Sequence, residues 1–454
     1  MTMESSNVIN FESFSNKVGQ FSLRERTCLI PEMNRLGSHL LAASFRSFGI
    51  RAKILETFQG MDLGMAHTSG KECFPCQITM GDILHFMKQE MARLGAKFDS
   101  DAYVYFLPEA DGPCRFGMYN KYQRIVLDSF PGLSGLRIGA LTTADGYSLS
   151  GIIEEARVTD LRKSSYVALV VGDVLDRLLW RVRPYEKEPG LADLVIEKCL
   201  EYMVNTFERF GQGLQFDQIL ERLEVVIKEV KAVMDSQIPR KPLIGMVGEI
   251  YLRTHVKANQ DVIRMLEKHG AEVVNASVSE WINFTSYDHY RSAKIALGFS
   301  LKQLKFDRLK DHLKDLFTYG GDLFYQEYRQ RQIYKRALAL IDLAKDHKVS
   351  HLEDVIKEQD LYSFDLGTEA CLSIAGMMEY VRAGYNGLVN VYPFTCMPSI
   401  TTSSIVRPLM NKLKVPYLDT PYDSSTQPGR ESAVRTFMYQ ADQHFKRYGR
   451  HVTK

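Results

Sequence analysis

The strongest constraint in this 454-residue chain is the repeated alternation of short apolar, β-prone runs with amphipathic helical segments. Such alternation is typical of a parallel sheet, because parallel neighbours need a crossover, usually a helix, between them. Strands are predicted in two groups. The first group comprises residues 27–30, 51–55, 102–107, 137–142 and 166–171, and the second comprises 243–248, 271–275, 387–392 and 415–418.

The two groups of strands predict an α/β protein with two flavodoxin- or Rossmann-like parallel-sheet lobes. A lead-in over residues 1–25 precedes the first lobe, which covers 26–175. Residues 176–240 are mostly helical in pattern and form a connector. The second lobe covers 241–454 and includes a helical insertion, rich in Lys, Arg and Tyr, over 288–348.

The net charge and the number of cysteines limit which partners and which cellular compartment we expect for the protein. The chain has 57 Lys and Arg against 55 Asp and Glu, a net charge of +2, so bulk charge gives no reason to expect nucleic acid or membrane as a partner. Seven cysteines are too few for a disulfide framework and are an odd number. No apolar segment reaches the ~18 residues of a membrane span, and no signal-peptide core is present. We therefore expect a soluble, cytoplasmic protein.

Cys73 and Cys76 in the first lobe form a C-x-x-C motif at the start of a predicted helix. The motif alone fits three kinds of site: a zinc site, a thioredoxin-like redox pair or half of an iron–sulfur site. No second C-x-x-C follows at the spacing of a zinc ribbon, and the predicted lobe is larger than a thioredoxin domain. The motif alone does not distinguish among these three kinds of site.

Two further cysteines, Cys114 in the first lobe and Cys396 in the second, each lie a few residues beyond a predicted strand. Pro113 precedes the first, and Pro398 follows the second by two residues. Ligands of open α/β sheets collect beyond the carboxyl ends of the strands, so the two loops and the C-x-x-C loop are candidates for one pocket. Helices that begin after Cys76 and Cys396 would direct positive N-termini at an anionic, thiolate-ligated cluster. The competing interpretation is that Cys114 and Cys396 are small buried apolar residues.

The other cysteines have a simpler interpretation. Cys28 lies in a predicted strand, and Cys199 and Cys371 lie in predicted helices beside apolar residues. We predict that all three pack in the interior. Nucleotide motifs are absent: the stretch from Gly64 to Lys71 lacks the Walker A spacing, and no dinucleotide fingerprint occurs.

Five sequence blocks in a fixed order carry a resemblance to a known family. They are GKECFPC at 70–76, GPCRFGMY at 112–119, RPYE at 183–186, GMVGEIY at 245–251 and NVYPFTCMP at 390–398. In this order they resemble the 2-hydroxyacyl-CoA dehydratase and benzoyl-CoA reductase-related proteins. The narrower resemblance is to the cysteine-containing domain often fused to acyl-CoA dehydratase activases, and it covers about residues 25–440.

The resemblance implies a [4Fe–4S] cluster held by Cys114 and Cys396 together with Cys73, Cys76 or both. Four ligands would close the cluster for electron transfer, and three would leave one iron open for chemistry. It also implies an ATP-dependent activator of actin/Hsp70-like fold as the electron donor, and an acyl-CoA-like substrate that is reduced or dehydrated in anaerobic metabolism. The enzyme would then be a lyase or reductase of the 2-hydroxyacyl-CoA dehydratase type. Related proteins carry an [8Fe–9S] double cubane, which would need further cysteines of this chain.

The chain departs from the family pattern in ways that keep other functions open. It contains no activator domain, so the donor must act in trans, and Ser399 stands where the family pattern has Gly. One alternative is a cluster-bearing electron-transfer or accessory subunit without catalysis, and another is a structural zinc protein. For an enzyme, Arg115, Tyr119 and Arg183 are candidates for positioning the substrate, and a dimer is compatible with the sequence.

Overall fold

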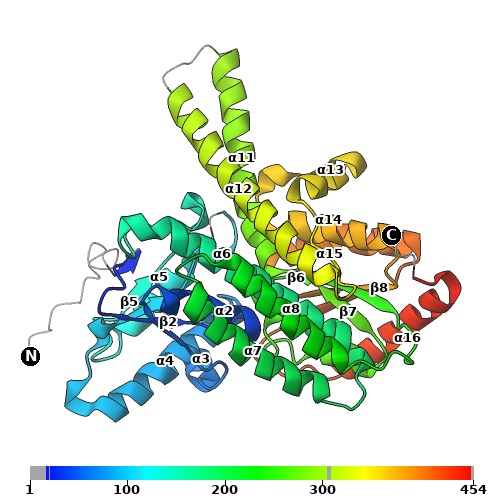
Figure 1. Cartoon of the computed structure of the whole chain (residues 1–454), viewed down its shortest axis with the longest axis horizontal. Coiled ribbons are helices and arrows are strands. Elements are labelled where there is room, and N and C mark those ends of the chain that lie inside the picture. The colour runs from blue at the N-terminus through cyan, green and yellow to red at the C-terminus, as the bar shows by residue number, and fades with distance from the viewer. Residues whose placement is uncertain (1–16, 20, 111, 304–307, 451–454) are drawn as a thin grey trace, which may run out of the picture. The chain divides into compact units, whose positions relative to one another are not determined.

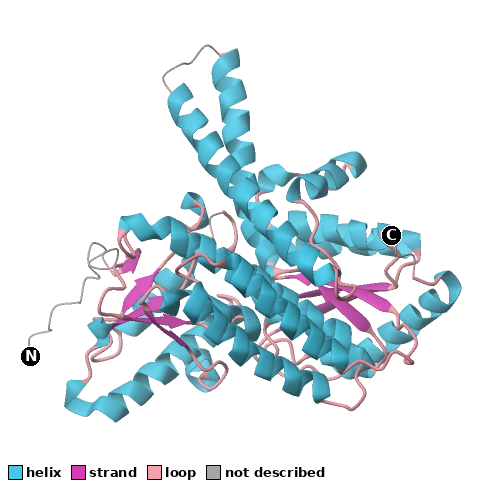
Figure 2. Cartoon of the chain, in the orientation of Figure 1, coloured by secondary structure: helices cyan, strands magenta, loops and turns pink. Residues whose placement is uncertain are grey.

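The computed structural model describes residues 17–19, 21–110, 112–303 and 308–450 (Figure 1). The described residues divide into two compact units. Unit 1 contains the described residues before Glu32, together with Gly49–Glu72 and Cys76–Thr159. Unit 2 contains Glu32–Phe48, Cys73–Pro75 and the described residues from Asp160 onward. Each unit combines strands with several helices (Figure 2).

Unit 1 is built on a five-stranded sheet in which all paired strands are parallel. Its strands are β1 (Val18–Gly19), β2 (Thr27–Ile30), β3 (Arg51–Ile54), β4 (Tyr103–Phe106) and β5 (Arg137–Gly139). Their order across the sheet is β1-β5-β4-β2-β3. In β2, Thr27 is in register with Arg51 of β3 on one side and with Tyr103 of β4 on the other.

Unit 2 contains a four-stranded sheet, also with parallel pairs throughout. Its strands are β6 (Leu243–Gly248), β7 (Glu272–Asn275), β8 (Gly387–Pro393) and β9 (Tyr417–Tyr422), in the order β7-β6-β8-β9. Every residue of the central strands β6 and β8 is buried. Continuous burial is expected of parallel strands that are covered on both faces, and it fits their mainly apolar sequences, to which Asn390 in β8 is an exception.

The two sheets share one topology. Counted from β2 in unit 1 and from β6 in unit 2, four consecutive strands are arranged in the order 2-1-3-4. This is the order with which flavodoxin-like sheets begin, so the predicted α/β fold with two parallel-sheet lobes is confirmed. The direction of winding reverses between the first and third strands, and ligands of such sheets bind beyond the carboxyl ends of those two strands.

Three helices accompany the sheet of unit 1: α3 (Met61–Ala66), α4 (Phe74–Leu94) and α5 (Tyr119–Asp128). The start of α4, which carries the C-x-x-C motif, lies close against α3. A Cβ atom added to Gly81 would lie 2.2 Å from the carbonyl oxygen of Gly60, and one added to Gly60 would lie 2.0 Å from that of Gly81. Glycine at both positions therefore permits the approach that fixes α4.

Unit 2 has two apolar cores. The first is formed mainly by α2 (Arg35–Ser47), α6 (Glu155–Val182), α7 (Leu191–Phe210), α8 (Phe216–Ala232) and the end of α12 (Leu309–Leu338). The second packs the sheet against α13 (Val349–Gln359), α14 (Glu369–Arg382) and α15 (Met397–Leu413). The other α-helices are α9 (Ile250–Thr254), α10 (Val262–Lys268), α11 (Val278–Lys302) and α16 (Arg430–Tyr448). No helix among the described residues has both the length and the apolar character needed to cross a membrane.

Short 3₁₀ turns complete the connections between these elements. They are η1 (Gly95–Lys97), η2 (Ser100–Ala102), η3 (Arg115–Met118), η4 (Thr143–Asp145), η5 (Arg183–Tyr185) and η6 (Phe364–Leu366). Of these turns, η3 begins directly after Cys114 and leads into α5.

The strand predicted over residues 166–171 is wrong. This segment lies inside α6, a helix of 28 residues, where all of its side chains except Leu169 are buried. The helix runs through the first apolar core of unit 2, so it is apolar on several sides and has no clear helical period in this stretch. A short apolar run of this kind does not distinguish a buried strand from a buried helix.

The predicted helical insertion over 288–348 is a helical hairpin with different limits. Its first helix, α11, begins earlier, at Val278, and its second, α12, ends at Leu338. The earlier start has a local cause, because the Ser277 side chain caps α11 by accepting a hydrogen bond from the Glu280 N–H.

Candidate functional site

In unit 2, Cys396 lies just beyond β8, the third strand in the shared topology, and is the N-cap residue of α15. Its side chain is 5% exposed. The preceding residue, Thr395, has a φ of +66°, an unfavourable conformation for a β-branched residue. The backbone is thus held in a strained turn that places a cysteine at the N-terminus of a 17-residue helix.

The surroundings of Cys396 favour a neutral thiol in the absence of a bound cation. Burial raises its pKa well above the ordinary value, and the nearby Glu249 and Cys73 raise it further. Hydrogen bonds from Ser399 act in the opposite direction but do not cancel the effect of burial. Glu249 follows β6, the first strand of the sheet, so the carboxyl ends of the first and third strands meet at this cysteine.

The C-x-x-C motif lies at the start of α4. Cys73 directly precedes the helix and is 6% exposed, with a φ of +108°. Cys76 lies in the first turn, fully buried, and its charge would raise the pKa of Tyr105 and of Tyr122. The two cysteines therefore have different neighbours: Cys73 is close to Cys396 within unit 2, and Cys76 is close to two tyrosines within unit 1.

In unit 1, Cys114 follows β4, the third strand of its sheet, and is the N-cap residue of η3. Two hydrogen bonds fasten this region to the C-x-x-C loop. The Arg115 guanidinium donates to the backbone oxygen of Lys71 at 2.5 Å, and the Tyr122 hydroxyl donates to the backbone oxygen of His67 at 2.6 Å. The segment that contains Cys114 thus lies beside the segment that leads to Cys73.

Within unit 2, the charge of Cys73 would raise the pKa of Cys396. Within unit 1, a hydrogen bond joins the Cys114 loop to Lys71, in the loop that precedes the C-x-x-C motif. Within the part of the chain that the structure describes, no three His, Cys, Asp or Glu side chains are arranged so that they could hold a metal ion. The donor types suit a soft metal or an iron–sulfur cluster, but their present side-chain arrangement is not a closed coordination shell.

The three residues predicted to position a substrate differ in their surroundings. Arg115 is half-buried and bonded to Lys71. Tyr119 is 4% exposed, and its ring packs edge-on against Phe116 with 5.3 Å between centroids. Arg183 is buried and engaged by two carboxylates of unit 2, those of Glu267 at 2.6 Å and Asp193 at 3.0 Å. Arg183 thus already has a structural role.

Cys28, Cys199 and Cys371 are buried, as predicted for cysteines that pack in the interior. Burial raises the pKa of each of these thiols to about 12. They are thus poor nucleophiles, and they provide internal controls for experiments on the other four.

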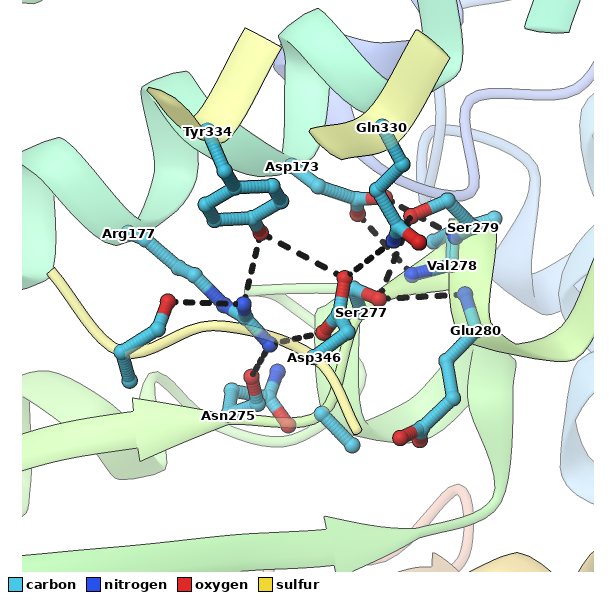
Figure 3. Close-up of polar contacts among 12 residues, drawn as sticks. Asp173, Arg177, Asn275, Ser277, Val278, Ser279, Glu280, Gln330, Tyr334 and Asp346 are labelled. Atoms are coloured by element: carbon cyan, nitrogen blue, oxygen red, sulfur yellow. Dashed lines mark hydrogen bonds and ion pairs between the residues drawn. The ribbon is translucent and has the colours of Figure 1, made fainter. Parts of the chain in front are cut away.

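Sequence reasoning missed a buried polar network in unit 2, shown in Figure 3. Arg177 of α6 forms an ion pair with Asp346 and donates hydrogen bonds to the Tyr334 hydroxyl at 2.6 Å and the Ala344 backbone oxygen at 3.0 Å. The Gln330 amide donates to Asp346 at 2.7 Å. This network joins α6 and α12 to the segment that precedes α13.

Asp173, one helical turn before Arg177, accepts hydrogen bonds from the N-terminus of α11. Its two carboxylate oxygens accept hydrogen bonds from the N–H groups of Val278 at 2.9 Å and Ser279 at 2.8 Å. Burial raises the pKa of Asp173 to about 6, and the charge of Asp346 adds to the shift. The signal available in the sequence was the occurrence of charged residues inside an otherwise apolar helical run.

Glu280 points away from this network in Figure 3 and lines a cavity of about 10 Å³, roughly the space that one water molecule needs. Arg253, His347, Ser373 and Tyr380 also line the cavity. Burial raises the pKa of Glu280 to about 8. A buried carboxyl that remains protonated at neutral pH avoids the cost of an ion in the interior, so this cavity fits a polar structural core.

The chain was also compared with known proteins. No family model matches it, and no curated protein matches it significantly.

Proposed function

We propose that the chain is an iron–sulfur redox protein in which Cys73, Cys76, Cys114 and Cys396 hold a [4Fe–4S] cluster. The proposed activity is that of a relative of the 2-hydroxyacyl-CoA dehydratases. The cluster, when bound, supplies one-electron chemistry, and the substrate is an acyl-CoA-like small molecule that is reduced or dehydrated. An ATP-dependent activator of actin/Hsp70-like fold would deliver the electron in trans.

One observation carries the proposal: Cys114 and Cys396 occupy equivalent positions in two sheets of the same topology. Each follows the third strand of a 2-1-3-4 sheet, and each is the N-cap residue of a helical segment. This is the edge at which such sheets bind ligands. A cysteine that only fills space would have no reason to recur at this position.

The surrounding residues support binding of an anionic, thiolate-ligated group. The N-terminal N–H groups of α15 and the hydrogen bonds from Ser399 favour negative charge on the sulfur of Cys396. Burial opposes that charge, so the thiolate forms when a metal compensates it, with release of a proton. Among the described residues no three potential ligand side chains are arranged for a metal, so binding would be coupled to local folding, as is common in such sites.

The proposed cluster also indicates the cellular compartment and the residues that would contact a substrate. Cysteines kept as thiols for a cluster need a reducing compartment, so we place the protein in the cytoplasm. Arg115 and Tyr119, next to Cys114 in sequence, would help to orient a substrate at this edge of unit 1. Arg183 has the weaker claim to that role, because Glu267 and Asp193 engage its guanidinium.

The test is spectroscopy on the full chain purified without oxygen. A broad visible absorption that bleaches with dithionite, together with an EPR signal in the reduced state, would support the proposal. Stoichiometric zinc with no visible absorption would contradict it and favour the structural zinc alternative. A cluster content near eight iron atoms per chain, on the order of twice that of one [4Fe–4S] centre, would favour the double cubane.

A second measurement separates an enzyme from an accessory subunit. If an added acyl-CoA changes the EPR signal of the reduced protein, the substrate binds near the cluster and the enzymatic form of the proposal holds. If a panel of acyl-CoA compounds leaves the signal unchanged while the activator still reduces the cluster, the protein is an electron-transfer subunit.

A further inference from the structure

The helical hairpin of unit 2 presents a second feature, independent of the cysteines. α11 (Val278–Lys302) and α12 (Leu309–Leu338) pack against each other, and Figure 1 shows their distal halves projecting beyond the sheet and the other helices of unit 2. Both helices of the hairpin carry large apolar side chains on their exposed surfaces. Such a patch on a projecting element is unusual for a monomer.

The apolar residues of α12 form a single stripe. Leu313, Phe317, Phe324 and Tyr328 are 36%, 76%, 75% and 45% exposed. At about 100° per residue, their spacing of four, seven and four places all of them within roughly 60° around the helix. On α11, Ile295 and Phe299, one helical turn apart, are 42% and 59% exposed.

The spacing of the stripe is the same in both directions along α12. An antiparallel copy of the helix, crossing at Gly320 and Gly321, would therefore place Phe317 opposite Phe324 and Leu313 opposite Tyr328. A Cβ atom added to Gly321 would meet no atom within 4 Å, whereas one added to Gly320 would lie 3.3 Å from the Tyr290 ring, so Gly321 is the open position of the pair. Small residues at a helix crossing let two backbones approach closely, and a two-fold interface must be complementary to itself.

The exposed area is sufficient for a specific interface. With about 200 Å² per aromatic side chain and somewhat less for the aliphatic ones, the six residues expose roughly 600 Å² in one copy. Two copies would thus bury on the order of 1,200 Å² from apolar side chains alone, at the lower limit of a standard protein–protein interface before polar neighbours are counted.

We propose that the chain forms a two-fold symmetric dimer through the α11–α12 hairpin, with α12 crossing its copy at Gly321. The occupant of the apolar stripe is thus a second copy of this chain. The palindromic spacing favours this occupant over an unrelated partner, because a foreign surface would not require the stripe to match itself.

The test is the mass of the full chain in solution, measured by sedimentation or light scattering at micromolar concentration. We expect twice the monomer mass of 51.9 kDa. The double substitution Phe317→Glu with Phe324→Glu should give a monomer. The matched control is Leu194→Glu on α7, which changes another apolar side chain, 72% exposed, and should leave the dimer intact.

A second variant protects the test against misfolding. Gly321→Gln adds a side chain where the structure has open space, so the monomer should fold normally while the crossing is blocked. We expect at least a tenfold weaker dimer, with an unchanged circular dichroism spectrum. A monomeric wild-type chain would overturn the proposal, whether or not the hairpin binds another protein, and so would a dimer that neither variant weakens.

Discussion

The two helix starts at residues 73–76 and 396–399 are alike in sequence. The first reads Cys-Phe-Pro-Cys and the second Cys-Met-Pro-Ser, so they differ in whether the fourth residue carries a thiol. Both have a cysteine directly before the helix and a proline in the first turn. Both turns include a non-glycine residue with positive φ, Cys73 itself in one and Thr395 in the other. The fourth position is a buried cysteine in the first and a buried serine in the second.

This difference indicates which features of the helix start are general. The cysteine before the helix and the strained turn occur in both blocks, so they set the direction of the thiol. The residue one turn later varies between thiol and hydroxyl. In unit 2 the hydroxyl has a use of its own, because hydrogen bonds from Ser399 partly offset the effect of burial on the pKa of Cys396.

The largest expected effect comes from removing the cysteines that follow the third strands. Cys396→Ala and Cys114→Ala should each lose nearly all iron if, as proposed, both positions supply a cluster ligand beyond the carboxyl ends of the strands. Iron per chain after anaerobic purification measures this. Cys199→Ala, which removes a buried thiol of the helical core, should keep its iron. If either single variant retains a full iron complement, Cys114 and Cys396 do not have equivalent roles in the two sheets.

A smaller loss of iron is expected when the first helix start is made like the second. Cys76→Ser should retain on the order of half the iron or more, because the serine hydroxyl keeps an oxygen donor at this position, whereas alanine at Cys114 or Cys396 leaves none. Its EPR signal should change, since one ligand differs. Ser399→Ala is the matched variant and should keep the iron. If Cys76→Ser loses as much iron as Cys396→Ala, serine cannot replace cysteine at the fourth position of the first helix start.

Much of what this comparison uses could be predicted from the sequence. Residues 27–30 and 243–248 are predicted correctly as strands, because their apolar, β-prone runs are short and end at turn residues. The positions of Cys114 and Cys396 beyond strands were also predictable. What could not be predicted depends on long-range contacts: the Arg177–Asp346 pair joins residues 169 positions apart, and no local pattern specifies it.

The sheets themselves provide the next test of the comparison. Gly248 ends β6 with a φ of +127°, and a Cβ there would lie 2.0 Å from the Val391 oxygen. We expect Gly248→Ala to lower the free energy of unfolding by about 3 kcal/mol, from overpacking plus backbone strain. Gly81→Ala in unit 1, with a normal φ, should cost about 2 kcal/mol.

Denaturant unfolding measures both variants. Gly298→Ala on α11 is the control, because its Cβ would meet nothing within 4 Å, and it should raise stability by about 0.5–1 kcal/mol. If Gly248→Ala is as stable as the wild type, the close approach of the first and third strands at this edge is wrong.

The smallest effect concerns the strained turn. Thr395→Gly should stabilise the fold by about 0.5–1 kcal/mol, because glycine adopts a positive φ without steric cost. Lys414→Gly, at a φ of +58° after the other end of α15, should gain a similar amount. Thermal unfolding compares the two. A gain at Lys414 with a loss at Thr395 would mean that the Thr395 side chain, rather than its backbone, holds the turn.

The central claim is that four cysteines, the first and last of which are 323 positions apart, hold one inorganic centre. Iron and acid-labile sulfide per chain test it most directly. In full-length protein purified without oxygen, we predict about four of each, with both lost together in Cys114→Ala and Cys396→Ala. Protein that carries neither iron nor sulfide after anaerobic reconstitution would contradict the claim, as would a cluster that survives both substitutions.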